Sequence, residues 1–230
     1  MGHDDAGLLI SLLLGLGLGA RHAFEPDHVA AIGALTAHAP GLRRGALIGM
    51  LWGVGHAFSL CGVGLGLAML STRMPTRLAD TLELVVAGML IGLGARGVAR
   101  AVKRAPSLAS GRHGGAGRAH ADATHHVHLG PWVFSRPLLV GMIHGLAGSG
   151  ALTAIAMAEL PTIASRFAFI TLFGIGSLLG MATVSGLWGW PLARLSRRPL
   201  AARYVAGATS VCSALLGLAW GAAAIQRMFA

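Results

Sequence analysis

The residues RHAFEPDH, at positions 21–28, interrupt an apolar stretch that runs from Ala6 to about Leu35. The stretch is long enough to cross a bilayer, which takes about 20 apolar residues. Ionisable side chains are costly in a membrane, so they persist mainly where they face a cavity or one another. Pro26 predicts a helix break, because its ring clashes with the carbonyl of His22 and it cannot donate a hydrogen bond. The sequence therefore predicts a broken transmembrane helix that carries a polar site.

The composition of the whole chain is that of a membrane protein. Of its 230 residues, 54% are hydrophobic and 11% are charged, and the mean hydropathy is +0.68. Ordinary soluble domains have about a quarter of their positions charged. Cys61 and Cys212 both lie in apolar runs, which excludes a disulfide scaffold. We predict an all-α membrane protein with six transmembrane helices, over residues 6–35, 46–70, 82–102, 132–160, 167–192 and 204–229. Small residues four apart, as at Gly62 and Gly66, predict close packing of these helices.

The formal net charge of +10 is explained by membrane orientation. No basic strand with interleaved aromatics and no recognition-helix pattern predicts nucleic-acid binding. The loops after the first, third and fifth predicted helices, with the helix ends beside them, hold Arg43, Arg44, Arg96, Arg100, Lys103, Arg104, Arg112, Arg118, Arg136, Arg194, Arg197, Arg198 and Arg203. The opposite side holds Arg73, Arg77, Arg166 and Arg227. The positive-inside rule therefore places both termini outside and the long third loop in the cytoplasm.

The two halves of the sequence resemble each other. Three segments recur in order: GARHAF at 19–24 and GMIHGL at 141–146, WGVGH at 52–56 and FGIGS at 173–177, and VAG at 86–88 and 205–207. The offsets between the copies are 122, 121 and 119 residues. Since each copy has three spans, the second copy must cross the membrane upside down. We predict two inverted three-helix repeats, residues 1–104 and 131–230, joined by a cytoplasmic loop over 105–130.

Three histidines from different predicted helices reach similar depth in the membrane. At about 1.5 Å per residue, His22 lies about 21 Å from Leu8 in the first stretch, His56 about 15 Å into the second and His144 about 18 Å into the fourth. In a regular helix Asp27 and His28 would be rotated from His22 by about 140° and about 120° in opposite senses. Joint ligation of one ion therefore requires the helix to be broken between them.

These groups predict a transition-metal site inside the membrane. Two or three imidazoles with one carboxylate suit Ni2+, Co2+, Cu2+ or Zn2+, whereas Mg2+ would call for oxygen ligands. The predicted metal ligands are His22, Asp27, His28 and His56. The predicted cavity-lining residues are Glu25, His144 and Ser149, and a direct bond from His144 to the metal is not expected.

Two further groups of histidines are candidates for metal capture. The third loop holds His113, His120, His125, His126 and His128. A plain solvated linker is the alternative for this loop, because its histidines lack a fixed spacing. At the N-terminus, His3 could chelate Ni2+ or Cu2+ with the terminal amine, and an ordinary terminus is the alternative.

The motifs resemble those of a transporter family. HAFEPDH at 22–28 resembles the HxxxxDH signature of the nickel/cobalt transporter (NiCoT) superfamily. Gly55 and His56 resemble the start of its GHS motif, with Ala57 in place of the serine. With the His-rich loop and HGLAGSG at 144–150, the chain is most similar to the branch of urease accessory UreH-like permeases.

The resemblance implies uptake of Ni2+ or Co2+ as transported substrate across the bacterial cytoplasmic (inner) membrane. It implies no resident cofactor and no enzymatic activity, with the lipid bilayer, the metal ion and cytoplasmic nickel chaperones as partners. The family's LGFDTATE motif is missing, and the segment around His144 and Ser149 takes its place.

Two alternatives to uptake stay open. Six-span nickel/cobalt exporters of the same superfamily carry a similar His-x-x-Glu-Pro-x-His stretch, so efflux is one alternative. An intramembrane metalloenzyme using His22, Asp27 and His28 to activate water is the other. The enzyme is disfavoured because the chain has no HExxH pair and no nucleophile dyad near the cluster.

Overall fold

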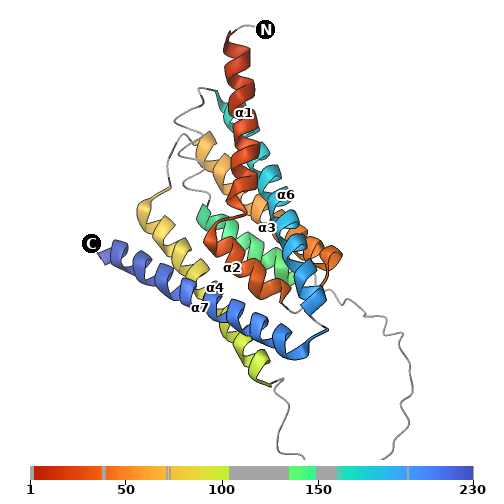
Figure 1. Ribbon diagram of the computed structural model, residues 1–230. Coiled ribbons are helices and arrows are strands. Elements are labelled where there is room, and N and C mark those ends of the chain that lie inside the picture. The colour runs from red at the N-terminus through yellow and green to blue at the C-terminus, as the bar shows by residue number, and fades with distance from the viewer. Residues whose placement is uncertain are drawn as a thin grey trace, which may run out of the picture.

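All regular structure in the described part of the chain is helical (Figure 1). The computed structural model describes residues 3–37, 40–70, 72, 74–103, 135–148, 160, 162–195 and 197–229. The helices are α1 (His3–His22), α2 (Pro26–Thr36), α3 (Leu42–Met69), α4 (Thr76–Lys103), α6 (Ile163–Leu195) and α7 (Pro199–Phe229). A further helix covers residues 135–148 and is named helix 135–148 below. The all-α class is thus confirmed.

Within the described ranges, four helices are long and apolar enough to cross a membrane: α3, α4, α6 and the part of α7 from Leu200 to Phe229. The chain is therefore a multi-pass membrane protein. The first predicted span is divided between α1 and α2, and the apolar part of α1, Leu9–His22, is shorter than a full crossing. The fourth predicted span is described over helix 135–148 and at Leu160. The predicted loop over 105–130 and Ser149 lie outside the described residues.

The helices pack in two groups with α2 between them. On one side α6 packs along both α1 and α3, and on the other side α4 packs along α7 (Figure 1). The short helix α2 contacts α7, α6, α4 and α3, so it reaches both groups. Any side chain on α2 is therefore close to helices from both ends of the sequence.

Glycines allow some of these helices to meet backbone against backbone. A Cβ atom at Gly141 would overlap the carbonyl oxygen of Trp52, and one at Gly19 would overlap that of Phe173. Both separations are far below 3.0 Å, a distance that real Cβ atoms keep. Helix 135–148 thus packs directly on α3, and α1 packs directly on α6.

Glycines in similar small-residue patterns differ in their contacts within the described part of the chain. A Cβ atom at Gly176 would overlap the carbonyl oxygen of Leu16, so this glycine is a helix contact. At Gly62 and Gly66, no atom of another described helix lies within 4 Å of the Cβ position. The pattern cannot tell which face of a helix meets a neighbour, and these two glycines lie on a face that no described helix covers.

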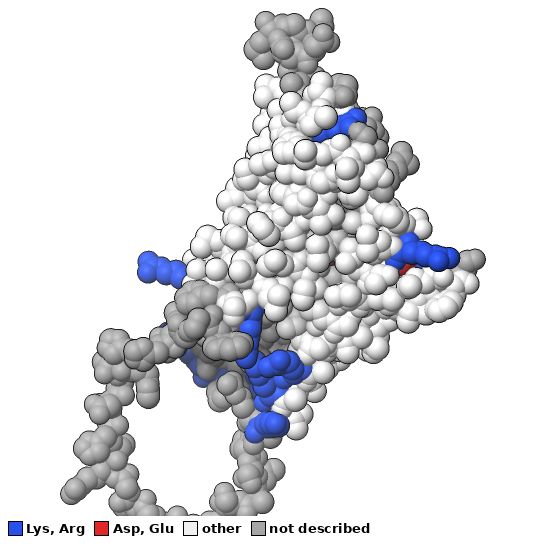
Figure 2. Space-filling model, turned by 180° about the vertical axis from the view of Figure 1, so that it is seen from behind, with Lys and Arg blue, Asp and Glu red and all other residues white. Residues whose placement is uncertain are grey.

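The outer surface of the bundle is mostly uncharged. Large apolar side chains are exposed on the long helices, among them Phe58, Leu179 and Leu215. Figure 2 shows a broad surface without charged residues, and most of the Lys and Arg residues in this view are gathered at one end of the molecule. An apolar belt with cations grouped beyond it is the surface that a bilayer requires.

Candidate metal centre

The helix break predicted at Pro26 is present. Helix α1 ends at His22, and α2 begins at Pro26 with Glu25 as its N-cap in an extended conformation (φ −62°, ψ 146°). Proline is tolerated at the first position of a helix, where its missing N–H would have no helical partner. The backbone N–H of Glu25 donates to the carbonyl of His22 at 3.0 Å, so the break satisfies that carbonyl within the turn.

The break brings the motif's two histidines together. His22 sits on the last turn of α1, and Asp27 and His28 sit on the first turn of α2. The ring centroids of His22 and His28 are 4.4 Å apart. Asp27 is 4% exposed and His28 is 1% exposed, so both are buried at the junction of the two helices.

Two more helices each contribute one buried histidine. The ring centroid of His56, on α3, lies 5.3 Å from that of His22 and 5.1 Å from that of His28. The ring of His144, on helix 135–148, lies 4.2 Å from that of His28. The structure thus brings the four predicted ligands and His144 into one cluster, called the histidine cluster below.

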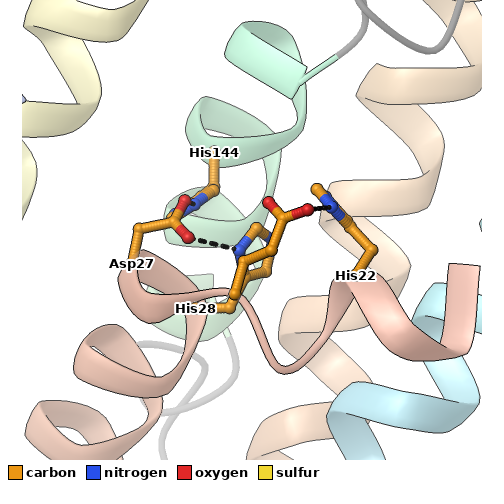
Figure 3. A network of polar contacts seen from close by, with 5 residues as sticks. His22, Asp27, His28 and His144 are labelled. Carbon is orange, nitrogen blue, oxygen red and sulfur yellow. Dashed lines mark hydrogen bonds and ion pairs between the residues drawn. The ribbon is translucent and has the colours of Figure 1, made fainter.

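Two carboxylates contact three of these rings (Figure 3). The Nδ1 atom of His28 lies 3.0 Å from Asp27 Oδ1, and Nε2 of His144 lies 2.5 Å from Asp27 Oδ2. The Nδ1 atom of His22 lies 2.8 Å from Oε1 of Glu25. Because an ionised carboxylate only accepts hydrogen bonds, each of these ring nitrogens is the one that donates its N–H.

The remaining ring nitrogens are buried without a partner. Among the described residues these are Nε2 of His22, Nε2 of His28, Nδ1 of His144 and both nitrogens of His56. Leaving a buried polar atom unsatisfied costs about 1–3 kcal/mol, so several such atoms in one place indicate a site that can bind a ligand.

The spacing of the donor atoms suits a small ion. One ligand atom from each of His22, His28 and His56 lies within 4.8 Å of the others, and the same holds for Asp27, His28 and His144. Transition-metal bonds to imidazole nitrogen are about 2 Å long, so two ligands on opposite sides of one ion lie about 4 Å apart. Either trio can close on a metal with small movements of its side chains.

The comparisons with known proteins give one relative. The urease accessory protein UreH of Bacillus sp. (strain TB-90) is 32% identical to this chain over 196 residues, which covers 85% of this chain and 83% of the relative. The chain belongs to the UreH family. This is the branch of the NiCoT superfamily that the motif at 22–28 resembles. No family model matches the chain, and no solved structure matches it.

In this UreH-family chain a cavity of about 820 Å³ leads to the histidine cluster. Its wall includes His22, Asp27, His28 and His144, and Glu25, whose side chain is half exposed, also lines it. Both described residues that were predicted to line a cavity, Glu25 and His144, lie in this wall. His56 does not line it and is fully buried behind the other histidines.

The sequence analysis missed the aromatic residues that pack on the cluster. The Trp52 ring lies 5.4 Å from that of His28 and 5.7 Å from that of His144. The Phe173 ring lies 5.3 Å from that of His22. The sequence could have indicated them, since Trp52 and Phe173 occupy equivalent positions in the two similar segments 52–56 and 173–177.

An ionic cluster at the cavity wall was also missed. Arg227 on α7 donates from Nε to Asp80 Oδ1 at 2.9 Å and from Nη2 to Glu83 Oε2 on α4. Arg227 and Glu83 both line the cavity. Arg21 lines the cavity as well, so the approach to the histidine cluster carries two arginines, and Arg227 is the one paired with Asp80 and Glu83.

Proposed function

We propose that this UreH-family chain is a permease that carries Ni2+ or Co2+ across the bacterial cytoplasmic membrane, in the direction of uptake. The observation that carries the proposal is the set of buried imidazole nitrogens without partners at the end of a cavity. Imidazole donors suit Ni2+ and Co2+, and the family resemblance implies the same cargo. The predicted ligand residues His22, Asp27, His28 and His56, with His144 beside them, form the proposed binding centre.

An inverted repeat would give this centre its alternating access. A two-fold axis in the membrane plane would match each contact between the halves with an equivalent contact in which the two halves have changed roles. Gly19 meets Phe173, and its predicted repeat equivalent Gly141 meets Trp52, the predicted equivalent of Phe173. The ring contacts exchange as well, since His22 packs on Phe173 at 5.3 Å and His144 packs on Trp52 at 5.7 Å. These paired contacts support two inverted three-helix halves that rock about a site between them.

A two-way flux assay tests both the cargo and the direction. The full-length chain is reconstituted in proteoliposomes of determined orientation, and radioactive Ni2+ is placed inside or outside. The assay is run at pH 7.5, above the ordinary imidazole pKa of about 6.5, because protons compete with metal for the ring nitrogens. We expect flux from the side of the termini to the side of the loop over 105–130. Flux only in the opposite direction would identify an exporter, and no flux of either metal would contradict the proposal.

Replacing Arg227 with glutamine is expected to raise the initial rate of Ni2+ uptake about two- to five-fold at low ionic strength and low Ni2+ concentration. The side chain lines the cavity and places a positive charge on the path of a dication, and its removal also frees the carboxylates of Asp80 and Glu83. Charge that lines a cleft changes the local concentration of an ion and its rate of arrival. The increase should fade as salt is added, since salt screens exposed charges.

Arg77→Gln is the matched control for Arg227→Gln. Arg77 is exposed and lies on the same predicted side of the membrane, and the cavity wall does not include it. An equal increase in both variants would mean that only the overall surface charge matters. An unchanged rate in Arg227→Gln would contradict a role for this residue in ion entry.

A further inference from the structure

Both carboxylate oxygens of Asp27 are already engaged by imidazole rings. Oδ1 accepts from Nδ1 of His28 and Oδ2 accepts from Nε2 of His144. Asp27 is 4% exposed, so both of these contacts are largely shielded from solvent. The carboxylate therefore fixes which nitrogen of each ring carries the proton.

The nitrogens that this arrangement leaves with lone pairs are those without partners. They are Nε2 of His28 and Nδ1 of His144, and both are buried. His22 follows the same pattern, because Glu25 contacts its Nδ1 atom and leaves Nε2 free. In each case a carboxylate takes one ring nitrogen and the opposite nitrogen is left for a ligand.

We propose that Asp27 is a positioning residue and that the cargo binds to imidazole nitrogens of His22, His28 and His56. The inference rests on the proposed function and revises the sequence-based prediction that Asp27 is a direct ligand. A carboxylate behind a metal-bound histidine orients the ring and raises its basicity. An ion held between Asp27 and the facing nitrogens of His28 and His144 would replace the two hydrogen bonds, whereas ligation by His22, His28 and His56 through their free nitrogens keeps them.

The same carboxylate connects the site to the second half of the chain. Asp27 and His28 belong to α2, and His144 belongs to helix 135–148. A metal on His28 Nε2 draws electron density from the ring and makes its Nδ1–H a stronger donor to Asp27. Site occupancy is thereby linked, through His28, Asp27 and His144, to the contact between the two halves.

Co2+ absorption of the purified full-length protein in detergent tests the role of Asp27. Bands in the visible range report the number and type of Co2+ ligands, and titration gives the affinity. For Asp27→Asn we expect the affinity to fall about 10–100-fold, as is usual when a residue behind a metal ligand is replaced. At saturation its spectrum should match that of the unmodified protein, because the three imidazole ligands remain. The spectrum of His28→Ala should change, because a ligand is lost.

His144 provides a second pair of variants. His144→Ala removes the donor to Asp27 Oδ2 and should lower the affinity about ten-fold, toward the lower end of the range for such residues. His144→Gln keeps a side-chain N–H and should recover most of that loss. Ser210→Ala is the matched control, since Ser210 is buried and its hydroxyl donates to the Ala206 carbonyl of its own helix. Helical content by circular dichroism and elution volume establish that each variant is folded.

The outcomes separate this inference from the proposed function. If the unmodified protein binds and transports metal but saturated Asp27→Asn has shifted bands, or binds as poorly as His28→Ala, Asp27 is a ligand and the inference is wrong. If the unmodified protein binds neither Ni2+ nor Co2+, the proposed function fails and the inference falls with it. Should Asp27→Asn not fold, the His144 variants decide: equal affinities of His144→Ala and His144→Gln would overturn the inference.

Discussion

Replacing His28 with alanine is expected to abolish high-affinity Ni2+ binding and Ni2+ flux while the chain still folds. His28 lies at the centre of the cluster, with its ring 4.4 Å from His22, 5.1 Å from His56 and 4.2 Å from His144. It belongs to both trios of donor atoms that could hold an ion. Its removal takes a donor from each trio, so the loss of affinity should exceed the 10–100-fold expected for Asp27→Asn.

Calorimetric titration with Ni2+ and flux in proteoliposomes measure the effect of His28→Ala. Thr36→Val is the matched control on the same helix, because Thr36 is buried and its hydroxyl donates to the Ile32 carbonyl within α2. We expect the control to retain binding and flux. Unchanged Ni2+ affinity in His28→Ala would show that His28 is not a ligand and would contradict the proposed metal site.

The parts of the site that the sequence predicted are those set by local chemistry and by depth. Proline fixes the break near position 26 whatever surrounds it, because the clash involves only its own chain. A rise of about 1.5 Å per residue fixes how deep a side chain lies, so His22, His56 and His144 could be placed at one level. Because ionisable side chains are costly in lipid, histidines at one depth are expected to face one another or a common cavity.

The parts that the sequence did not predict depend on which helix faces meet. The two hydrogen bonds of Asp27 require α2 and helix 135–148 to approach at one particular rotation. The pairing of Arg227 with Asp80 joins residues 147 positions apart, and no local pattern relates them. Gly62 and Gly176 lie in similar small-residue patterns, yet within the described part of the chain Gly176 meets another helix and Gly62 does not. The spacing of residues along a helix shows which of them share a face, but it does not show which other helix packs on that face.

Replacing Gly141 with alanine is expected to destabilise the protein strongly, although alanine favours helices. A Cβ atom there would overlap the Trp52 carbonyl oxygen and lie 2.9 Å from the backbone nitrogen of His56. Both neighbours are backbone atoms in the middle of α3, so they cannot turn away as a side chain could. Overpacking typically costs about 1–3 kcal/mol, and this contact should reach the upper end. For a chain of this size a loss of about 3 kcal/mol lowers the melting temperature by about 6–12 °C.

Gly62→Ala is the matched control for Gly141→Ala. It should raise the melting temperature slightly, whereas Gly141→Ala should lower it. No atom of another described helix lies within 4 Å of its Cβ position, so we expect only the helix propensity to change, in favour of the folded state by about 1 kcal/mol at most. Thermal unfolding in detergent, followed by circular dichroism, measures both variants. Gly141→Ala should also bind Ni2+ more weakly, since separating helix 135–148 from α3 moves His144 away from Trp52 and from Asp27 on α2. Equal melting temperatures for the two variants would mean that helix 135–148 does not pack on α3 through this glycine.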